Sequence, residues 1–247
     1  MPVLSNLPIR LFVISAVLFL TLPVMANELK LTDRTAADIE LDEYRKPTEI
    51  INFTGVEKGD KVLDLLAGGG YYSELLAHVV GKNGKITLQI PKAYLSFIGD
   101  ELDKRLANNR LPNVSYLLSE ASNLHLPQNY YDSAFLVLGY HDMFFTDGDW
   151  DFPTATVMPQ VAKSMKLGGK LLVIDHQAAK GRGSKDTKTL HRIEADFVID
   201  DLKKYGFSLV KRSKLLENKQ DKHNISVFSP KLRRKTDRFV LLLERVE

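Results

Sequence analysis

Short apolar segments alternate with longer amphipathic segments along most of the chain. The apolar segments are bounded by Gly, Asn, Asp or Pro, which predicts buried strands at residues 61–66, 85–88, 114–118, 133–138 and 170–174. The stretches between them have the apolar spacing of helices, at residues 72–80, 93–107 and 154–165. Repeated strand–helix units predict a parallel sheet with helices on both faces.

The two ends of this pattern differ from its middle. Residues 36–44 and 47–53 predict short helices lying over the top of the sheet. After a helix at 194–205, residues 208–215 and 239–245 predict two strands joined by a long polar loop, as an antiparallel hairpin at the sheet edge. The fold class is therefore α/β: a Rossmann-like open sheet, mostly parallel, with an antiparallel C-terminal edge strand.

The first residues have the pattern of an export signal. Arg10 precedes an uncharged apolar run, Leu11–Leu22, and the small residues Val24 and Ala26 follow it. This predicts a secretory signal at residues 1–26 that is cleaved after Ala26, because a spanning helix needs about 20 apolar residues. An uncleaved anchor is the alternative. The expected mature protein is a single periplasmic domain, residues 27–247.

Composition narrows the functional classes. The 247 residues are 44% hydrophobic and 26% charged, which is ordinary for a globular protein. A net charge of +3 without a basic stripe argues against a nucleic-acid partner. The absence of cysteine excludes disulfides, thiolate catalysis and Cys-ligated metals. A small molecule is the expected partner, with membrane contact only through the signal segment before cleavage; the sequence does not set the oligomeric state.

A glycine turn follows the first predicted strand. Residues 67–70 read Ala-Gly-Gly-Gly and lead directly into a helix near Tyr71. Glycine lets the backbone approach a ligand closely, and a helix N-terminus offers unpaired N–H groups. In open α/β sheets such a turn lies where ligands bind. The pattern predicts a nucleotide-like cofactor, the alternative being a plain tight turn.

The segment VLDLLAGGG, residues 62–70, resembles the first motif of class I S-adenosylmethionine (SAM)-dependent methyltransferases. Asp64 occupies the acidic position and Gly68 and Gly70 occupy the second and third glycine positions, whereas Leu66 replaces the first. The resemblance implies SAM as cofactor. It also implies that the residues around the turn bind it: Asp64, Ala67, Gly68, Gly69, Gly70 and Tyr71.

Two further positions of that family can be compared. The second strand ends in Leu88-Gln89-Ile90-Pro91, without the acidic residue that takes the ribose hydroxyls in the family. Gln89 is the candidate replacement, and weaker cofactor binding is expected because an amide is a weaker acceptor than a carboxylate. After the third strand, Glu120 and Ala121 resemble the acidic–small pair that meets the adenine. An exposed Glu120 without a function is the alternative.

Histidines gather at two other predicted strand ends. His141 and Asp142 follow the fourth strand, His176 ends the fifth, and His191 opens what is expected to be the next helix. His141, Asp142 and His176 are the candidate catalytic residues, with a histidine as general base. Alternatively, His141, Asp142, His176 and His191 hold a divalent metal. In a third interpretation His176 and His191 only cap helices or form hydrogen bonds to loop backbone.

The short stretches YHD, DH, LHRI and KTDRF resemble a subgroup of small exported methyltransferases. The resemblance implies a SAM-dependent methyltransferase that acts on an unidentified small molecule. Two other functions stay open. One is a non-catalytic protein of the same fold that binds a nucleoside or metabolite, and the other is a metal-assisted hydrolase or lyase that uses His141, His176 and His191.

Overall fold

The computed structural model describes residues 34–247, and the predicted signal at residues 1–26 lies outside this range. The described strands form one seven-stranded sheet in the order β3-β2-β1-β4-β5-β7-β6. Strands β1 to β5 are parallel, and β7 pairs antiparallel with both β5 and β6. Their bounds are β1 Lys61–Leu65, β2 Lys85–Ile90, β3 Val114–Leu118, β4 Tyr131–Val137, β5 Met165–His176, β6 Phe207–Ser213 and β7 Arg238–Arg245.

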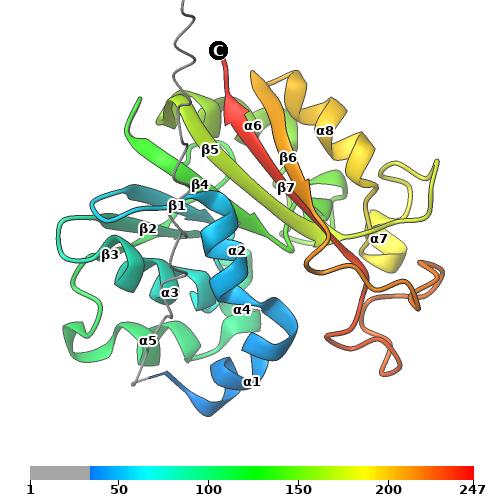
Figure 1. Ribbon diagram of the computed structural model, residues 1–247, viewed down its shortest axis with the longest axis horizontal. Coiled ribbons are helices and arrows are strands. Elements are labelled where there is room, and N and C mark those ends of the chain that lie inside the picture. Colours follow the sequence, from blue (N-terminus) through cyan, green and yellow to red (C-terminus); the bar gives the residue numbers. More distant parts are fainter. Residues whose placement is uncertain (1–33) are drawn as a thin grey trace, which may run out of the picture.

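Helices cover both faces of the sheet (Figure 1). They are α1 Ala36–Arg45, α2 Pro47–Thr54, α3 Tyr71–Val80, α4 Leu95–Ile98, α5 Glu101–Leu106, α6 Thr154–Ser164, α7 Thr187–Leu190 and α8 Ala195–Lys203. Apolar side chains of α2 and α3 pack on one face, with Phe135 of β4, and those of α6 and α8 pack on the other, with Leu136. Successive strand residues point to opposite faces, so β4 contributes to both cores. The predicted fold class is confirmed.

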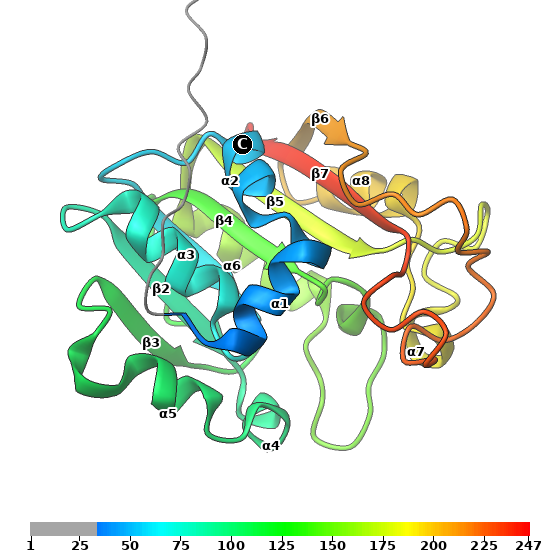
Figure 2. The same cartoon turned by 60° about the horizontal axis from the view of Figure 1, so that its bottom comes forward.

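Local chemistry sets the ends of the first helices. The Thr35 side chain accepts a hydrogen bond from Asp38 N at the start of α1, and Lys46 ends α1 in a left-handed conformation. Pro47 then begins α2. Proline suits this position because the first N–H groups of a helix have no acceptor within the helix. As a result α1 and α2 meet at an angle. Figure 2 shows α1 crossing in front of the sheet below α2, and Leu41 of α1 packs against the same apolar cluster as α2.

Three predicted boundaries are wrong. Residues 93–107 do not form one helix, because Gly99 has φ 54° and separates α4 from α5. The fifth strand is longer than predicted, since Met165 already pairs with Tyr131 of β4, before a register shift that ends at Lys170. His191 does not open a helix, but follows α7 with φ 53°. The edge strand of the hairpin is β6, because β7 lies between it and β5.

The topology places a crevice at the carboxyl end of β1. The chain moves outward from β1 to β2 and β3, then returns to place β4 on the other side of β1. Connections therefore leave β1 and β4 in opposite directions, and ligands bind at such a switch point. Leu41 and Arg45 of α1 lie there beside Leu138, which follows β4. Among the described helices, none is long and apolar enough to cross a membrane.

Candidate functional site

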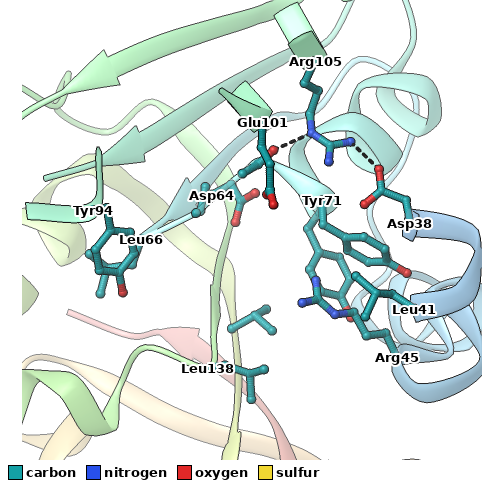
Figure 3. A pocket seen from close by; sticks show the side chains of 15 residues that line it. Asp38, Leu41, Arg45, Asp64, Leu66, Tyr71, Tyr94, Glu101, Arg105 and Leu138 are labelled. Atoms are coloured by element: carbon teal, nitrogen blue, oxygen red, sulfur yellow. Dashed lines mark hydrogen bonds and ion pairs between the residues drawn. The ribbon is translucent and has the colours of Figure 1, made fainter. Parts of the chain in front are cut away.

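A cavity of about 250 Å³, here called the cofactor cavity, lies at this switch point (Figure 3). The ends of β1 and β4, the glycine turn, α1 and α5 all contribute to its wall. The lining residues are Asp38, Leu41, Arg45, Asp64, Leu66, Ala67, Gly68, Gly69, Tyr71, Tyr72, Tyr94, Glu101, Arg105, Val137 and Leu138. The structure thus brings together five of the predicted cofactor residues: Asp64, Ala67, Gly68, Gly69 and Tyr71.

Asp64 supplies a buried carboxylate to this cavity. It is 3% exposed, and the Ser73 hydroxyl donates a hydrogen bond of 2.6 Å to its Oδ2. Burial raises the pKa of Asp64 to about 6, although the serine bond acts in the other direction. At neutral pH the carboxylate is charged and poorly solvated. A cationic group, such as an α-ammonium, would compensate for that lost solvation.

Gly68 and Gly70 have different roles in the turn. A Cβ on Gly68 would meet no atom within 4 Å, so Gly68 borders the open cavity. A Cβ on Gly70 would lie 2.8 Å from Leu88 Cδ1 and 3.0 Å from Arg105 Cδ. Gly70, which does not line the cavity, is required by packing and by its φ of 80° at the start of α3.

The residues that directly follow β1 and β4 share an unusual backbone conformation. Leu66 has φ 54° and Leu138 has φ 60°, in the region that favours glycine, and both line the cofactor cavity. Leu66 occupies the position where the resembled motif has its first glycine, and its left-handed backbone is one that glycine adopts more readily. Left-handed bulky residues of this kind concentrate at functional sites.

Gln89 does not reach the cofactor cavity. Its side chain is fully buried; Oε1 accepts from Leu66 N at 3.2 Å and Nε2 donates to the Ser119 carbonyl at 2.9 Å. The side-chain amide of Gln89 therefore connects the ends of β1, β2 and β3 by hydrogen bonds. Neither Glu120 nor Ala121 lines the cavity: Glu120 accepts from Lys92 N, and Ala121 belongs to the core. The structure places these three predicted residues in structural contacts.

Sequence reasoning missed the carboxylate of Glu101. Glu101, at the start of α5, lines the cavity so close to the turn that a Cβ on Gly69 would collide with its Oε2. In Figure 3 its side chain points into the cavity from the side opposite Arg45. No motif marks this position, because the helix break at Gly99 that turns α5 toward β1 is not visible in the apolar pattern.

Arg105 fixes the glycine turn to α1. Its guanidinium donates to the Gly69 carbonyl and pairs with Glu74 and, at 2.9 Å, with Asp38 of α1. Arg105 and both carboxylates are buried. Buried charges are retained when they are paired and hydrogen bonded. The turn, α1 and α3 are thus held in place by interactions within the chain.

His141 lies between two carboxylates. Its Nδ1 is 2.8 Å from Asp175 Oδ1, and its Nε2 is 3.1 Å from Asp142 Oδ1. Burial opposes the charged ring, but the negative charges of Asp175 and Asp142 outweigh it and raise the pKa of His141 to about 10. The raised pKa favours the protonated ring at neutral pH, which makes His141 a poor general base there.

His191 joins this pair, so that three ligand-type atoms converge. His191 Nδ1 is 3.2 Å from His141 Nε2 and 3.6 Å from Asp142 Oδ1. These atoms, His141 Nε2, Asp142 Oδ1 and His191 Nδ1, are a set that could hold a metal ion. A tetrahedral zinc ion with bonds of about 2.0–2.1 Å separates its ligand atoms by roughly 3.3–3.4 Å, which is close to the observed spacing.

His176 is separate from that set. Its Nδ1 is 2.8 Å from Thr236 Oγ1, and its Nε2 makes no hydrogen bond within residues 34–247. Burial, followed by the positive charge of His141 and Arg238, lowers the pKa of His176 well below its ordinary value. His176 is therefore a neutral imidazole. The structure divides the predicted catalytic residues into a charged pair, His141 with Asp142, and a neutral His176.

His176 lines a second cavity, of about 450 Å³. We call it the arginine cavity, because its wall includes Arg45, Arg233, Arg234 and Arg238. The loop between β6 and β7 closes one side. In both Figure 1 and Figure 2 this loop lies beside α7, and Val227 N donates to the Leu190 carbonyl there. Leu41, Arg45 and Leu138 line both cavities, so the two are neighbours.

Comparison with known proteins decides the family. The model of the ubiE/COQ5 methyltransferase family matches residues 38–187, which is more than half of the chain. The chain belongs to this family. The matched region includes the glycine turn, Glu101, His141 and His176, but ends before the β6–β7 loop that closes the arginine cavity. The predicted class I methyltransferase family and its cofactor, SAM, are confirmed.

Relatives match only part of their own length. A ubiquinone/menaquinone biosynthesis C-methyltransferase of Francisella philomiragia is 32% identical over 123 residues, which are 49% of this chain and 45% of that protein. Its counterpart in Shewanella piezotolerans is 29% identical over 130 residues, 53% of this chain and 48% of that protein. The chain thus spans about half the length of the curated relatives it matches.

Solved structures share the fold at low identity. A SAM-dependent methyltransferase from Aquifex aeolicus is 18% identical, with a TM-score of 0.59 over 83% of this chain and 98% of that one. A phosphoethanolamine N-methyltransferase of Haemonchus contortus, in complex with SAM, is 14% identical, with a TM-score of 0.58 over 82% of this chain and 53% of that one. These likenesses support the methyltransferase fold.

Proposed function

We propose that this protein transfers a methyl group from SAM to a small-molecule acceptor. The observation that carries the proposal is the cofactor cavity: it lies at the switch point, borders Gly68 and contains the buried carboxylate of Asp64. Methyl transfer needs a nucleophile aligned with the methyl group and the removal of one proton. A second, adjoining cavity gives the acceptor a place beside the cofactor.

The cavity's own residues suggest how SAM is held. Asp64 would compensate the α-ammonium group of SAM, and the N–H groups at the start of α3 would bind its α-carboxylate. Glu101 would accept hydrogen bonds from the ribose hydroxyls in place of the acid missing after β2. When bound, SAM supplies an electrophilic methyl group.

His176 is the proposed proton acceptor. It is neutral, it lines the arginine cavity, and Thr236 orients its ring through Nδ1 while Nε2 stays without a partner in the described chain. A proton from the acceptor would move to Nε2. His141, protonated between two carboxylates, would serve instead to fix the ends of β4 and β5.

Calorimetric titration with SAM and S-adenosylhomocysteine (SAH) tests the proposal. Saturable binding of both at one site supports a SAM-dependent enzyme, and slow formation of SAH in the presence of an acceptor establishes transfer. Binding without transfer for any acceptor would favour the non-catalytic alternative. No binding of either compound would overturn the proposal.

A metal-assisted function is the second candidate, and the convergence of His141, Asp142 and His191 favours it. Asp175 on His141 Nδ1 would orient that ligand, as second carboxylates do in metal sites. Zinc titration of protein treated with a chelator is the test. Micromolar zinc binding that is lost in His191→Ala supports a metal site; binding equal to the parent in that variant contradicts it.

We further propose that the protein acts in the periplasm, as a member of an exported subgroup. The support is the sequence pattern alone: the apolar run Leu11–Leu22, with Val24 and Ala26 before the expected cleavage point. Mass spectrometry of protein expressed in a Gram-negative host should find an N-terminus at Asn27. An intact Met1 in a cytoplasmic fraction would refute export.

A further inference from the structure

The arginine cavity has an unbalanced charge. Its wall contains the four arginines named above and His176, but no aspartate or glutamate. Arg234 pairs with Glu40, whereas Arg45, Arg233 and Arg238 form no ion pair with any residue of the described chain. The guanidinium of Arg45 instead lies 4.3 Å from the ring centre of Tyr71. Three of the four guanidinium groups in this cavity therefore have no acidic partner among the described residues.

Arg238 is the clearest part of this imbalance. It is only 8% exposed, its Nη2 donates to the Tyr44 carbonyl at 2.6 Å, and its buried Nε has no hydrogen-bond partner among the described residues. Burial lowers the pKa of Arg238; the charge of Arg45 acts in the same direction, and Tyr72 and Asp237 act against it. A buried guanidinium with an unpaired N–H is costly for a fold to keep. An oxyanion is the partner that such a fork binds best.

Much of the remaining wall is apolar, apart from Tyr44 and Thr236. Leu41, Leu138, Val227 and Phe228 line the cavity together with the arginines. A volume of about 450 Å³ is within the range of small-molecule sites, about 300–1,000 Å³. The occupant that these contacts fit is a small molecule with an apolar body and one anionic end.

We propose that the methyl acceptor is such an organic anion, bearing a carboxylate or phosphate group that binds the guanidinium of Arg238, with Arg45 beside it. Leu138 and Arg45 line both cavities, so the other end of the molecule would face the methyl group while His176 lies along its side. This inference rests on the proposed function, because it identifies the occupant of the arginine cavity as the acceptor.

Three small probes test the anionic end: benzoate, phenyl phosphate and the uncharged benzamide. Calorimetry on the full chain should show saturable binding of benzoate or phenyl phosphate, and at least about tenfold weaker binding of benzamide, since charge-assisted hydrogen bonds are the stronger ones. The anion that binds more tightly identifies the source as carboxylate or phosphate. Equal binding of all three probes, or none, would overturn the proposal.

Two variants and one control locate the site. Arg238→Met keeps length and removes charge, and Arg45→Met does the same at the half-buried neighbour; each should weaken anion binding at least about tenfold. Arg45→Met decides the matter if Arg238→Met does not fold. Arg212→Met is the control, because Arg212 is an exposed arginine outside the cavity that pairs with Asp196. Unchanged binding in both cavity variants contradicts the proposal.

Titration with SAH on the same proteins separates the two levels of inference. SAH binding without anion binding would refute the anionic acceptor and leave the proposed methyltransferase intact. Anion binding without SAH binding would mean that the cavity is an anion site of another function, which contradicts both the proposed function and the role of acceptor.

Discussion

Two glycines of this chain offer a matched test of the cofactor cavity. Gly68 in the turn has φ 56° and Gly55 at the end of α2 has φ 78°, and a Cβ at either position would meet no atom within 4 Å. The two glycines differ in the space that an added Cβ would enter. Gly68 lines the cofactor cavity, whereas Gly55 does not.

Alanine at either position should destabilise the protein by a similar amount. A left-handed backbone costs an ordinary residue about 1–2 kcal/mol. For a chain of this size 1 kcal/mol lowers Tm by about 2–4 °C, so both variants should melt roughly 2–8 °C below the parent. Only Gly68→Ala places a methyl group in the cofactor's space. Overpacking costs about 1–3 kcal/mol, which is about 5- to 150-fold in affinity.

Calorimetry with SAH, together with thermal melting, measures both effects. We expect Gly55→Ala to bind SAH like the parent and Gly68→Ala to bind at least about fivefold more weakly, with similar Tm values. Equal SAH affinity in the two variants would refute the reasoning that Gly68 borders the cofactor. Gly70 is unsuitable for this test, because its Cβ would collide with Leu88 and disturb the fold itself.

Three other substitutions probe single contacts. Glu101→Gln should weaken SAH binding about 5- to 30-fold if Glu101 holds the ribose, without a change in Tm; unchanged affinity in calorimetry would exclude that role. Gln89→Glu should lose at least about 2 kcal/mol in urea unfolding, because a carboxylate cannot donate to the buried Ser119 carbonyl; a parent-like midpoint would contradict the structure. Asp64→Asn should stabilise the unliganded protein at pH 8 by up to about 3 kcal/mol while weakening SAH binding. The folded pKa of about 6 exceeds the ordinary 3.8, so the parent is most stable below pH 3.8 with respect to this group and loses that stability as pH rises to 6. A variant no more stable than the parent at pH 8 would argue against that raised pKa.

The helices and strands that follow from a repeating apolar pattern could be predicted from the sequence. The alternation of apolar strands and amphipathic helices was enough to place β1 to β4, α1 to α3 and the two last strands, and the glycine motif located the cofactor turn. The positions of single side chains were less accessible. Gln89 stands at a strand end where a ribose contact is expected, yet its amide can both donate and accept, and it is used between buried backbone groups.

Contacts across the fold explain the other misses. Glu101 reaches the turn only because Gly99 breaks a helix that has continuous apolar spacing. The role of Arg238 could not be predicted, because nothing in the local sequence shows that this strand residue lies next to α1. His176 is the last residue of β5 and His141 comes shortly after β4. Only the tertiary structure places His141 between two carboxylates and His176 beside a threonine.

The wall shared by the two cavities has a thermodynamic consequence. Leu41, Arg45 and Leu138 touch whatever occupies either cavity, and Arg105 ties the helix that carries Arg45 to the glycine turn. If one ligand shifts this wall, the affinity for the other ligand changes as well. Thermodynamic linkage requires the two ligands to affect one another equally. If an anion tightens SAH binding by some factor, SAH must tighten anion binding by that same factor. The binding of the cofactor and the binding of the acceptor would then be coupled before any methyl group is transferred.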